Sequence, residues 1–250
     1  MISLTTDFDD FYSGQMKGII HKINSDAKII DITHKIKRYS IYEAAYVISN
    51  SYAFFPNGTI HVAVVDPGVG TDRIPIVINF DGHIFVGPDN GIFSFFDGEV
   101  FKINLDILSQ KSLKYGINSI SNSFHGRDIF APAAALLDIG IMDFLEKTNR
   151  HVKLPFKKEI SENIALISIL YVDSFGNIIL NLKKEDVNIK GIEVFGVDIP
   201  VLTHYEEGNG LDLIALYSSS GHLEISKYLG DANSILKLES GDLLRINLKN

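Results

Sequence analysis

The feature that most constrains the fold is the apolar run over residues 60–65, which ends abruptly at Asp66-Pro67-Gly68. Such runs are typical of a strand buried on both faces, as in a parallel sheet. The turn that follows places a carboxylate at the carboxyl end of that strand, where open α/β sheets bind ligands. Arg73 lies on the same loop. The stretch therefore predicts either a ligand site around Asp66 or an ordinary turn with a surface ion pair.

Residues 1–152 predict an α/β domain with a mostly parallel sheet. Strand-like runs alternate with helical patterns, and this order favours a sheet with helices on its faces. The expected strands are 2–6, 28–34, 60–65, 74–78 and 83–86, and the expected helices are 11–23, 40–54 and an alanine-rich helix near 131–137. Asp9 or Asp10 is expected to cap the first helix. Residues 98–122 show no clear pattern.

Residues 164–250 predict a smaller, all-β, barrel-like C-terminal domain. Short strand-like runs recur there with no long helical pattern between them. The runs are 165–172, 177–182, 192–197, 213–217, 223–226 and 243–248. Residues 153–163 are interpreted as a linker, because the chain there is basic, contains proline and has no periodicity.

Composition narrows the functional classes. Hydrophobic content of 46% and charged content of 22% are ordinary for a globular protein, and the net charge of −8 disfavours nucleic-acid binding. The absence of cysteine excludes disulfides and thiolate chemistry, and the scattered histidines show no metal-ligand spacing, so no metal site is predicted. No segment is apolar enough to span a membrane and the first residues do not resemble a signal peptide, so a cytoplasmic protein is expected.

Four polar clusters stand at predicted element ends or turns: Asp7 with Asp10, Asp66 with Arg73, His125, and the segment 173–177. Each has a structural alternative. Asp7 and Asp10 could be a helix cap and solvated charge, His125 could be a hydrogen-bond partner at a helix entrance, and 173–177 could be a turn between strands. No phosphate-binding loop, zinc-binding HExxH pair or serine nucleophile elbow is present.

Taken in order, these motifs resemble the S-adenosyl-L-methionine hydroxide adenosyltransferase family, relatives of the fluorinase and chlorinase. The resemblance runs nearly end to end. It is carried by Thr6-Asp7-Phe8, Gly14-Gln15-Met16-Lys17-Gly18, Asp31-Ile32-Thr33-His34, Phe55-Pro56-Asn57-Gly58-Thr59, Val65-Asp66-Pro67-Gly68-Val69-Gly70-Thr71, Gly87-Pro88-Asp89-Asn90-Gly91, Phe124-His125-Gly126-Arg127-Asp128, Asp173-Ser174-Phe175-Gly176-Asn177 and Ser219-Ser220-Gly221.

The resemblance implies an N-terminal α/β domain, a C-terminal β-barrel and a homotrimer. In the family the substrate lies between the N-domain of one subunit and the C-domain of its neighbour. The implied reaction is attack of hydroxide on the ribose 5′ carbon of S-adenosyl-L-methionine, which gives adenosine and L-methionine. No cofactor is implied beyond this substrate.

The resemblance also implies a catalytic set of Asp66, Arg73 and His125. A sulfonium is an excellent leaving group, whereas water is a poor nucleophile, so the set would align the water and help its deprotonation. Histidine titrates nearest neutrality, so His125 is the expected proton acceptor. Arg73 would keep Asp66 ionised and in place.

The remaining implied roles concern substrate binding. Asp7 would hold the ribose hydroxyls, Asp10 the methionine ammonium, Tyr39 would pack beside the substrate and Phe124 would line the pocket near the reacting carbon. In the second domain, Asp173, Phe175 and Asn177 would build the nucleoside pocket. Ser219 would meet the methionine carboxylate and Tyr205 would pack on adenine.

The sequence departs from the family pattern at two places. Asp9 replaces a glycine in a first turn that is about two residues shorter by alignment. Gly126 stands where the fluorinase has its halide-binding serine.

Two alternatives to hydrolysis remain. A halogenase would use chloride, although the charge of Asp66 would repel a halide. A non-catalytic sensor of S-adenosyl-L-methionine or adenosine would bind without turnover. A dinucleotide-dependent oxidoreductase fits worst, because no G-x-G-x-x-G motif follows the first strand.

Overall fold

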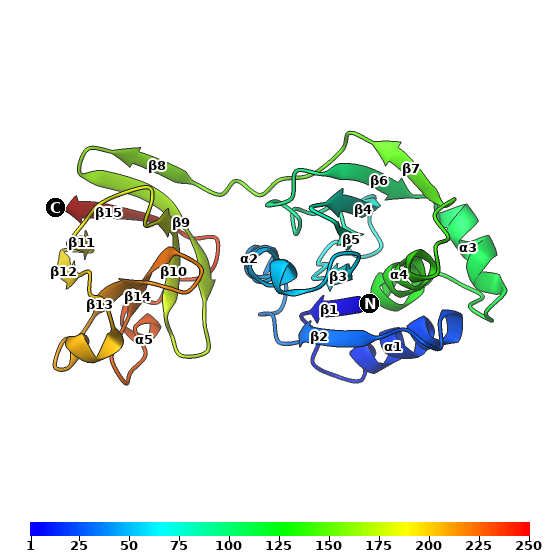
Figure 1. The fold of residues 1–250 in the computed structure, drawn as a ribbon, viewed down its shortest axis with the longest axis horizontal. Coiled ribbons are helices and arrows are strands. Elements are labelled where there is room, and N and C mark those ends of the chain that lie inside the picture. Colours follow the sequence, from blue (N-terminus) through cyan, green and yellow to red (C-terminus); the bar gives the residue numbers. More distant parts are fainter. The chain divides into compact units, whose positions relative to one another are not determined.

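The computed structural model describes residues 1–250 and divides into two compact units, Met1–Leu154 and Pro155–Asn250 (Figure 1). The boundary falls inside the segment interpreted as a linker. That segment also contains a strand, β8 (Lys158–Ser161), which pairs with the second unit's longest strand. No helix of the protein combines the length and the apolar character needed to cross a bilayer.

The first unit is built on a seven-stranded sheet in the order β2-β1-β3-β5-β4-β6-β7. Its strands are β1 (Ile2–Thr6), β2 (Ile29–Thr33), β3 (Ile60–Val64), β4 (Pro75–Phe80), β5 (His83–Pro88), β6 (Glu99–Ile103) and β7 (Leu145–Thr148). Strands β2, β1, β3 and β5 are parallel, whereas β4, β6 and β7 pair antiparallel. The sheet is therefore mixed, and the prediction of a mostly parallel sheet holds for only half of it.

The antiparallel half begins at a tight turn. Asp81 and Gly82 connect β4 to β5 with φ values of 51° and 74°. Two consecutive residues with positive φ suit a two-residue hairpin turn, and a hairpin forces its strands to run antiparallel. The two strands expected over 74–78 and 83–86 are therefore antiparallel neighbours, which the prediction of a mostly parallel sheet did not anticipate.

Helices cover both faces of this sheet. They are α1 (Tyr12–Ile23), α2 (Ile41–Ser51), α3 (Leu105–Leu113) and α4 (Ala131–Asp138), with a 3₁₀ turn η1 (Tyr52–Phe54) and a π-helical turn η2 (Gly126–Phe130). The alternating side chains of β3 are buried under these helices on both faces of the sheet. Val62 and Val64 pack in the core shared with α1, α3 and α4, and Ala63 packs in the core shared with α2. The run over 60–65 is thus buried on both faces, as predicted.

The predicted cap of the first helix is wrong. Helix α1 begins at Tyr12, and the preceding Phe11 makes no capping hydrogen bond through its side chain. Asp10 is exposed, and its Oδ1 accepts from the N–H of Phe11 at 2.7 Å, too early in the chain to satisfy the free donors of the first turn. Helix α2 is capped instead by Ser40, which accepts from the N–H of Glu43.

The second unit is a nearly closed antiparallel barrel. Its strands are β8, β9 (Ile164–Val172), β10 (Ile178–Lys183), β11 (Gly191–Val194), β12 (Val197–Pro200), β13 (Ile214–Tyr217), β14 (His222–Ser226) and β15 (Leu243–Lys249). Their order is β12-β11-β15-β9-β10-β14-β13, and a bridge between Val201 and Ala215 connects the two ends of this order. The helical pieces are short: η3 (Tyr205–Gly208) and α5 (Asn233–Leu236).

One predicted strand of this barrel proves to be two. The run over 192–197 is split between β11 and β12 by a turn at Phe195 and Gly196, whose φ values are 51° and 81°. Phenylalanine rarely adopts a positive φ, so no turn was expected there.

Candidate active site

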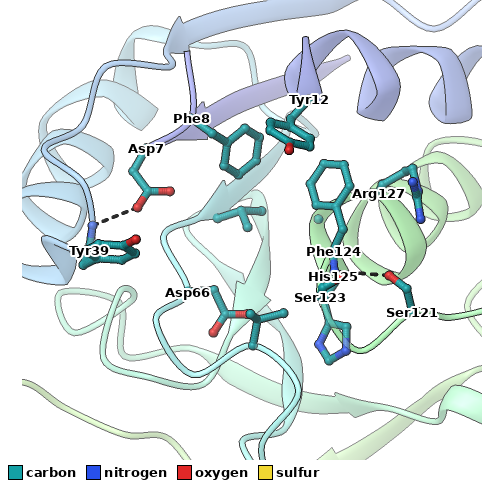
Figure 2. Close-up of a pocket in the computed structure, with 13 residues that line it drawn as sticks. Asp7, Phe8, Tyr12, Tyr39, Asp66, Ser121, Ser123, Phe124, His125 and Arg127 are labelled. Atoms are coloured by element: carbon teal, nitrogen blue, oxygen red, sulfur yellow. Dashed lines mark hydrogen bonds between the residues drawn. The ribbon is translucent and has the colours of Figure 1, made fainter. Parts of the chain in front are cut away.

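A pocket of about 430 Å³ opens at the carboxyl ends of β1 and β3 (Figure 2). These strands are parallel neighbours, and Thr6 is paired with Val64. Their carboxyl ends therefore lie together, which brings Asp7 and Asp66 to one edge of the sheet. This is the edge at which the sequence predicted a ligand site.

Five of the residues predicted for the site line this pocket: Asp7, Tyr39, Asp66, Phe124 and His125. Arg73 does not line the pocket but contacts both Asp66 and His125. Asp10 does not line the pocket.

Asp66 and Arg73 form a buried ion pair. Arg73 Nε donates to both carboxylate oxygens of Asp66 at 3.0 Å, and Nη2 also donates to Oδ2. The exposed fractions of the two side chains are only 5% and 9%. The guanidinium lies over the ring of Phe130, and its Nη1 is buried without a partner in the protein. An unpaired buried donor of this kind is suited to a water molecule or a polar ligand.

His125 is held by the same guanidinium. Arg73 Nη2 lies 2.7 Å from His125 Nδ1, and because arginine can only donate, Nδ1 must be the acceptor and the ring proton lies on Nε2. Burial, and then the charge of Arg73, lower the pKa of His125 below its usual value. The imidazole is therefore neutral at neutral pH. His125 immediately precedes η2, and turns of this type are frequent at functional sites.

The loop that carries Asp66 and Arg73 is fixed at both ends by the turn after β5. Asn90 Nδ2 donates to the carbonyl of Val65 at 2.8 Å, and the N–H of Asp89 donates to the carbonyl of Ile74 at 2.9 Å. Val65 precedes Asp66 and Ile74 follows Arg73. The motif 87–91 carries the family resemblance but has no predicted role, because nothing local in the sequence indicates where Asn90 points.

Asp7 is oriented by the backbone of Tyr39. Its Oδ2 accepts from the N–H of Tyr39 at 2.8 Å, and Tyr39 adopts a φ of 68°, which is unusual for a residue with a side chain. Burial raises the pKa of Asp7, and the nearby charge of Asp66 adds to this. The ring of Tyr39 is 70% exposed at the pocket.

Other lining residues had no predicted role. They include Phe8, Tyr12, Ser121, Ser123 and Arg127. Arg127 belongs to a motif that the sequence analysis quoted, and its Nε donates to the buried Asp128 at 2.6 Å. Asp128 in turn accepts from the N–H and hydroxyl of Ser121, which fixes the loop before His125.

The residues predicted in the second unit lie on its turns. Asp173 Oδ1 accepts from the N–H groups of Phe175 and Asn177, and Asp173 Oδ2 accepts from Asn177 Nδ2, all at 2.9 Å. The ring of Phe175 is 75% exposed at the tip of this turn. Ser219 is exposed in the turn between β13 and β14.

Tyr205 contacts an acid that the sequence analysis did not identify. Its hydroxyl donates to Glu224, which is buried on β14 and has a pKa raised chiefly by that burial. No three His, Asp or Glu side chains of the protein are grouped so as to hold a metal ion.

The α/β unit, the barrel and the strand-end pocket with an Asp–Arg–His set place the protein in a class of two-domain α/β plus β-barrel proteins. Comparison with known families agrees with this architecture. Residues 2–145 match the SAM hydroxide adenosyltransferase N-terminal domain, and residues 167–245 match the C-terminal domain of the same name. The chain belongs to the SAM hydroxide adenosyltransferase family.

Individual relatives cover nearly the whole chain. It is 35% identical to the (R)-S-adenosyl-L-methionine hydrolase of Methanocaldococcus jannaschii, over 98% of this chain and 95% of that protein. It is also similar to the crystal structure of an uncharacterized conserved protein from Thermotoga maritima, with a TM-score of 0.86, 31% identity and coverage of 98% and 99%. The fluorinase of Actinopolyspora mzabensis is more distant, at 19% identity over 93% of this chain and 91% of the fluorinase.

Proposed function

We propose that this protein hydrolyses S-adenosyl-L-methionine to adenosine and L-methionine. The observation that carries the proposal is the hydrogen-bonded set of Asp66, Arg73 and His125 at the pocket. The near full-length similarity to a protein named as an (R)-S-adenosyl-L-methionine hydrolase supports it.

The reaction is an in-line substitution at the ribose 5′ carbon. The oxygen of water forms a bond to C5′ while the C5′–S bond breaks. The electron pair of the C5′–S bond stays on sulfur, which leaves as the uncharged thioether of methionine. One proton of the water is lost. The charge of the sulfonium makes the carbon reactive, so the protein must mainly place the water and receive this proton.

The geometry favours Asp66 as the proton acceptor, in place of His125. In His125, Nδ1 is occupied by the hydrogen bond from Arg73 and Nε2 carries the proton of the neutral ring, so neither nitrogen can accept while that hydrogen bond lasts. A carboxylate offers about four lone-pair sites, and Arg73 does not use all of those on Asp66. Water attacking a carbon becomes strongly acidic, so a carboxylate is a sufficient base. His125 Nε2–H would then orient the water as a donor.

The substrate contacts follow from the same pocket. Asp7 would accept from the ribose hydroxyls, and Tyr39 and Phe124 would flank the nucleoside. Asp173, Phe175 and Asn177 would bind the nucleoside from the second unit and Ser219 the methionine carboxylate, with Tyr205 beside adenine. Asp10, exposed next to the pocket residues of the first turn, would meet the methionine ammonium. No cofactor is required.

The proposal includes a homotrimer in the cytoplasm, with each site shared by two subunits. The family resemblance supports this assembly. Complementation tests it, because His125→Ala and Asn177→Ala chains, each inactive alone, would regain activity when refolded together if sites are shared. Absence of rescue in mixed oligomers would place each site within one chain.

The central experiment uses purified protein, S-adenosyl-L-methionine and water enriched in heavy oxygen, with and without chloride. Adenosine with the heavy atom at its 5′ hydroxyl is expected. A 5′-chloro nucleoside would establish the halogenase alternative. Tight binding without any product would establish a sensor. If the protein hydrolyses the substrate, His125→Ala should abolish turnover and keep binding.

A further inference from the structure

Three aromatic rings at the pocket stand nearly perpendicular to one another. Phe8, Tyr12 and Phe124 all line it. The ring planes meet at 80° for Phe8 and Tyr12, 86° for Phe8 and Phe124, and 78° for Tyr12 and Phe124. The corresponding centroids are 6.2, 5.7 and 5.2 Å apart. Each pair is an edge-to-face contact, so the three rings form one compact aromatic cluster at this side of the pocket.

Two of these rings are supported by a further side chain. Phe11 stacks on Tyr12 with centroids 4.3 Å apart and planes tilted by 30°, and the guanidinium of Arg127 lies 5.2 Å above Phe124. Each of these contacts covers one face of a ring. Since both rings also line the pocket, the surfaces they leave there are available to a ligand.

The spacing suits an alkylated cation. A cation about 4 Å in front of each of three perpendicular rings requires centroids about 5.7 Å apart, within the range of cation–π contacts. The observed separations of 5.2–6.2 Å are those of ordinary edge-to-face ring pairs, and they also bracket this value. A sulfonium has no N–H or O–H to donate, so a carboxylate cannot bind it through hydrogen bonds. Aromatic faces bind such cations, as they do quaternary ammonium groups.

The rings also lie where the leaving group should be. In Figure 2, Phe8 and Tyr12 stand on the side of the pocket opposite Asp66 and His125, with Phe124 extending toward them. An in-line substitution places the departing sulfur on the far side of C5′ from the attacking water. We propose that Phe8, Tyr12 and Phe124 form a subsite that binds the sulfonium of the substrate through their ring faces. This inference rests on the proposed hydrolysis.

The kinetic consequence follows from the charge. Sulfur is cationic in the bound substrate and neutral in the product, so the ring faces bind the ground state more strongly than the transition state. Loss of a ring face should therefore raise KM and should not lower kcat. A ring that only shaped the pocket would affect charged and neutral ligands alike.

The test compares two unreactive ligands on the full-length protein: S-adenosylhomocysteine, whose sulfur is uncharged, and sinefungin, in which a carbon replaces the sulfur and an ammonium group replaces the S-methyl group beside it. Tyr12→Leu should weaken sinefungin by between about twofold and thirtyfold relative to S-adenosylhomocysteine. Tyr12→Phe retains the ring face and should keep the natural ratio. Phe54→Leu, at a phenylalanine that does not line the pocket, is the matched control.

The outcomes separate this inference from the proposed function. Equal loss for both ligands, or none, with adenosine still produced, would overturn the sulfonium subsite and leave hydrolysis standing. A natural protein that makes no adenosine from S-adenosyl-L-methionine would overturn both. A selective loss of sinefungin in Tyr12→Leu, with raised KM and undiminished kcat, is the expected result.

Discussion

Acidification should destabilise the first unit through one buried histidine. His61 lies in the interior strand β3 with a side chain that is fully buried. Its Nδ1 is 2.7 Å from the hydroxyl of Ser3, its Nε2 is 3.2 Å from Nδ1 of His83, and its ring stacks on Phe85. Burial, and then the neighbouring His83, lower the pKa of His61 from 6.5 to about 4.

The sign and size follow from proton linkage. The unfolded chain binds a proton at His61 near pH 6.5, whereas the folded protein resists it until about pH 4, so stability is fully present above pH 6.5 and is lost as the pH falls toward 4. Each pKa unit corresponds to about 1.4 kcal/mol, so 2.5 units correspond to a loss of about 3 kcal/mol. Between pH 7 and pH 5 the loss is about 2 kcal/mol.

Urea unfolding at pH 7 and pH 5 measures this loss, and His61→Gln isolates it. Because His222 in the second unit also has a pKa lowered to about 4, the informative quantity is the difference in pH dependence between natural protein and variant. His61→Gln should unfold more easily at pH 7 but lose about 2 kcal/mol less on acidification. The exposed His21→Gln is the control. Equal acid sensitivity in His61→Gln and the natural protein would refute the reasoning.

Three further changes test the site and the barrel. Asn90→Ala should lower kcat by about tenfold or more with little change in KM, because misplacing Asp66 affects the rate far more than substrate binding. The control is Asn50→Ala, which removes a side-chain amide to carbonyl hydrogen bond with Tyr46 on α2 and should leave kcat unchanged. The rate should fall only below pH 6.5, since burial and then Arg73 lower the pKa of His125 and its neutral form accepts from Arg73. Arg73→Gln should move this limb of the kcat/KM profile to higher pH, because one of the two causes that lower this pKa is removed while Asp66 still raises it. An unchanged limb would contradict this role of Arg73. Gly176→Ala should destabilise the barrel more than Gly196→Ala in thermal unfolding, because both have a φ near +80° but only at Gly176 would a Cβ lie 1.9 Å from Asp231.

The sequence was informative where local chemistry decides the structure. An apolar run ending in Asp-Pro-Gly specified β3 and the position of Asp66, and the family motifs identified residues that the fold brings to one pocket. The sequence was uninformative where contacts with residues distant in the chain decide the local structure. Strands β6 and β7 lack strong periodicity and are positioned by pairing with the rest of the sheet. The positive φ of Phe195 and the reach of Asn90 to Val65 likewise depend on tertiary contacts. Helix α3 does have a local signal, because Asn104 caps it by accepting from the N–H of Ile107, but this signal was overlooked.

Burying the ion pair of Asp66 and Arg73 costs free energy of folding, so its presence points to a role other than stability. Removing two charges from water often costs more than their attraction returns, so an apolar pair of similar volume would frequently stabilise a fold as well or better. Here the pair is held by two anchors at the ends of its loop, one of them a side-chain amide. Such anchoring adds little to a core but fixes the direction of a carboxylate beside a pocket. The hydrogen bonds of the pair are already formed within the fold, so this arrangement need not be assembled during the reaction. A water molecule held there would face the ribose carbon from one side while the proposed aromatic subsite binds the sulfonium on the other, which is the arrangement that the proposed in-line displacement requires.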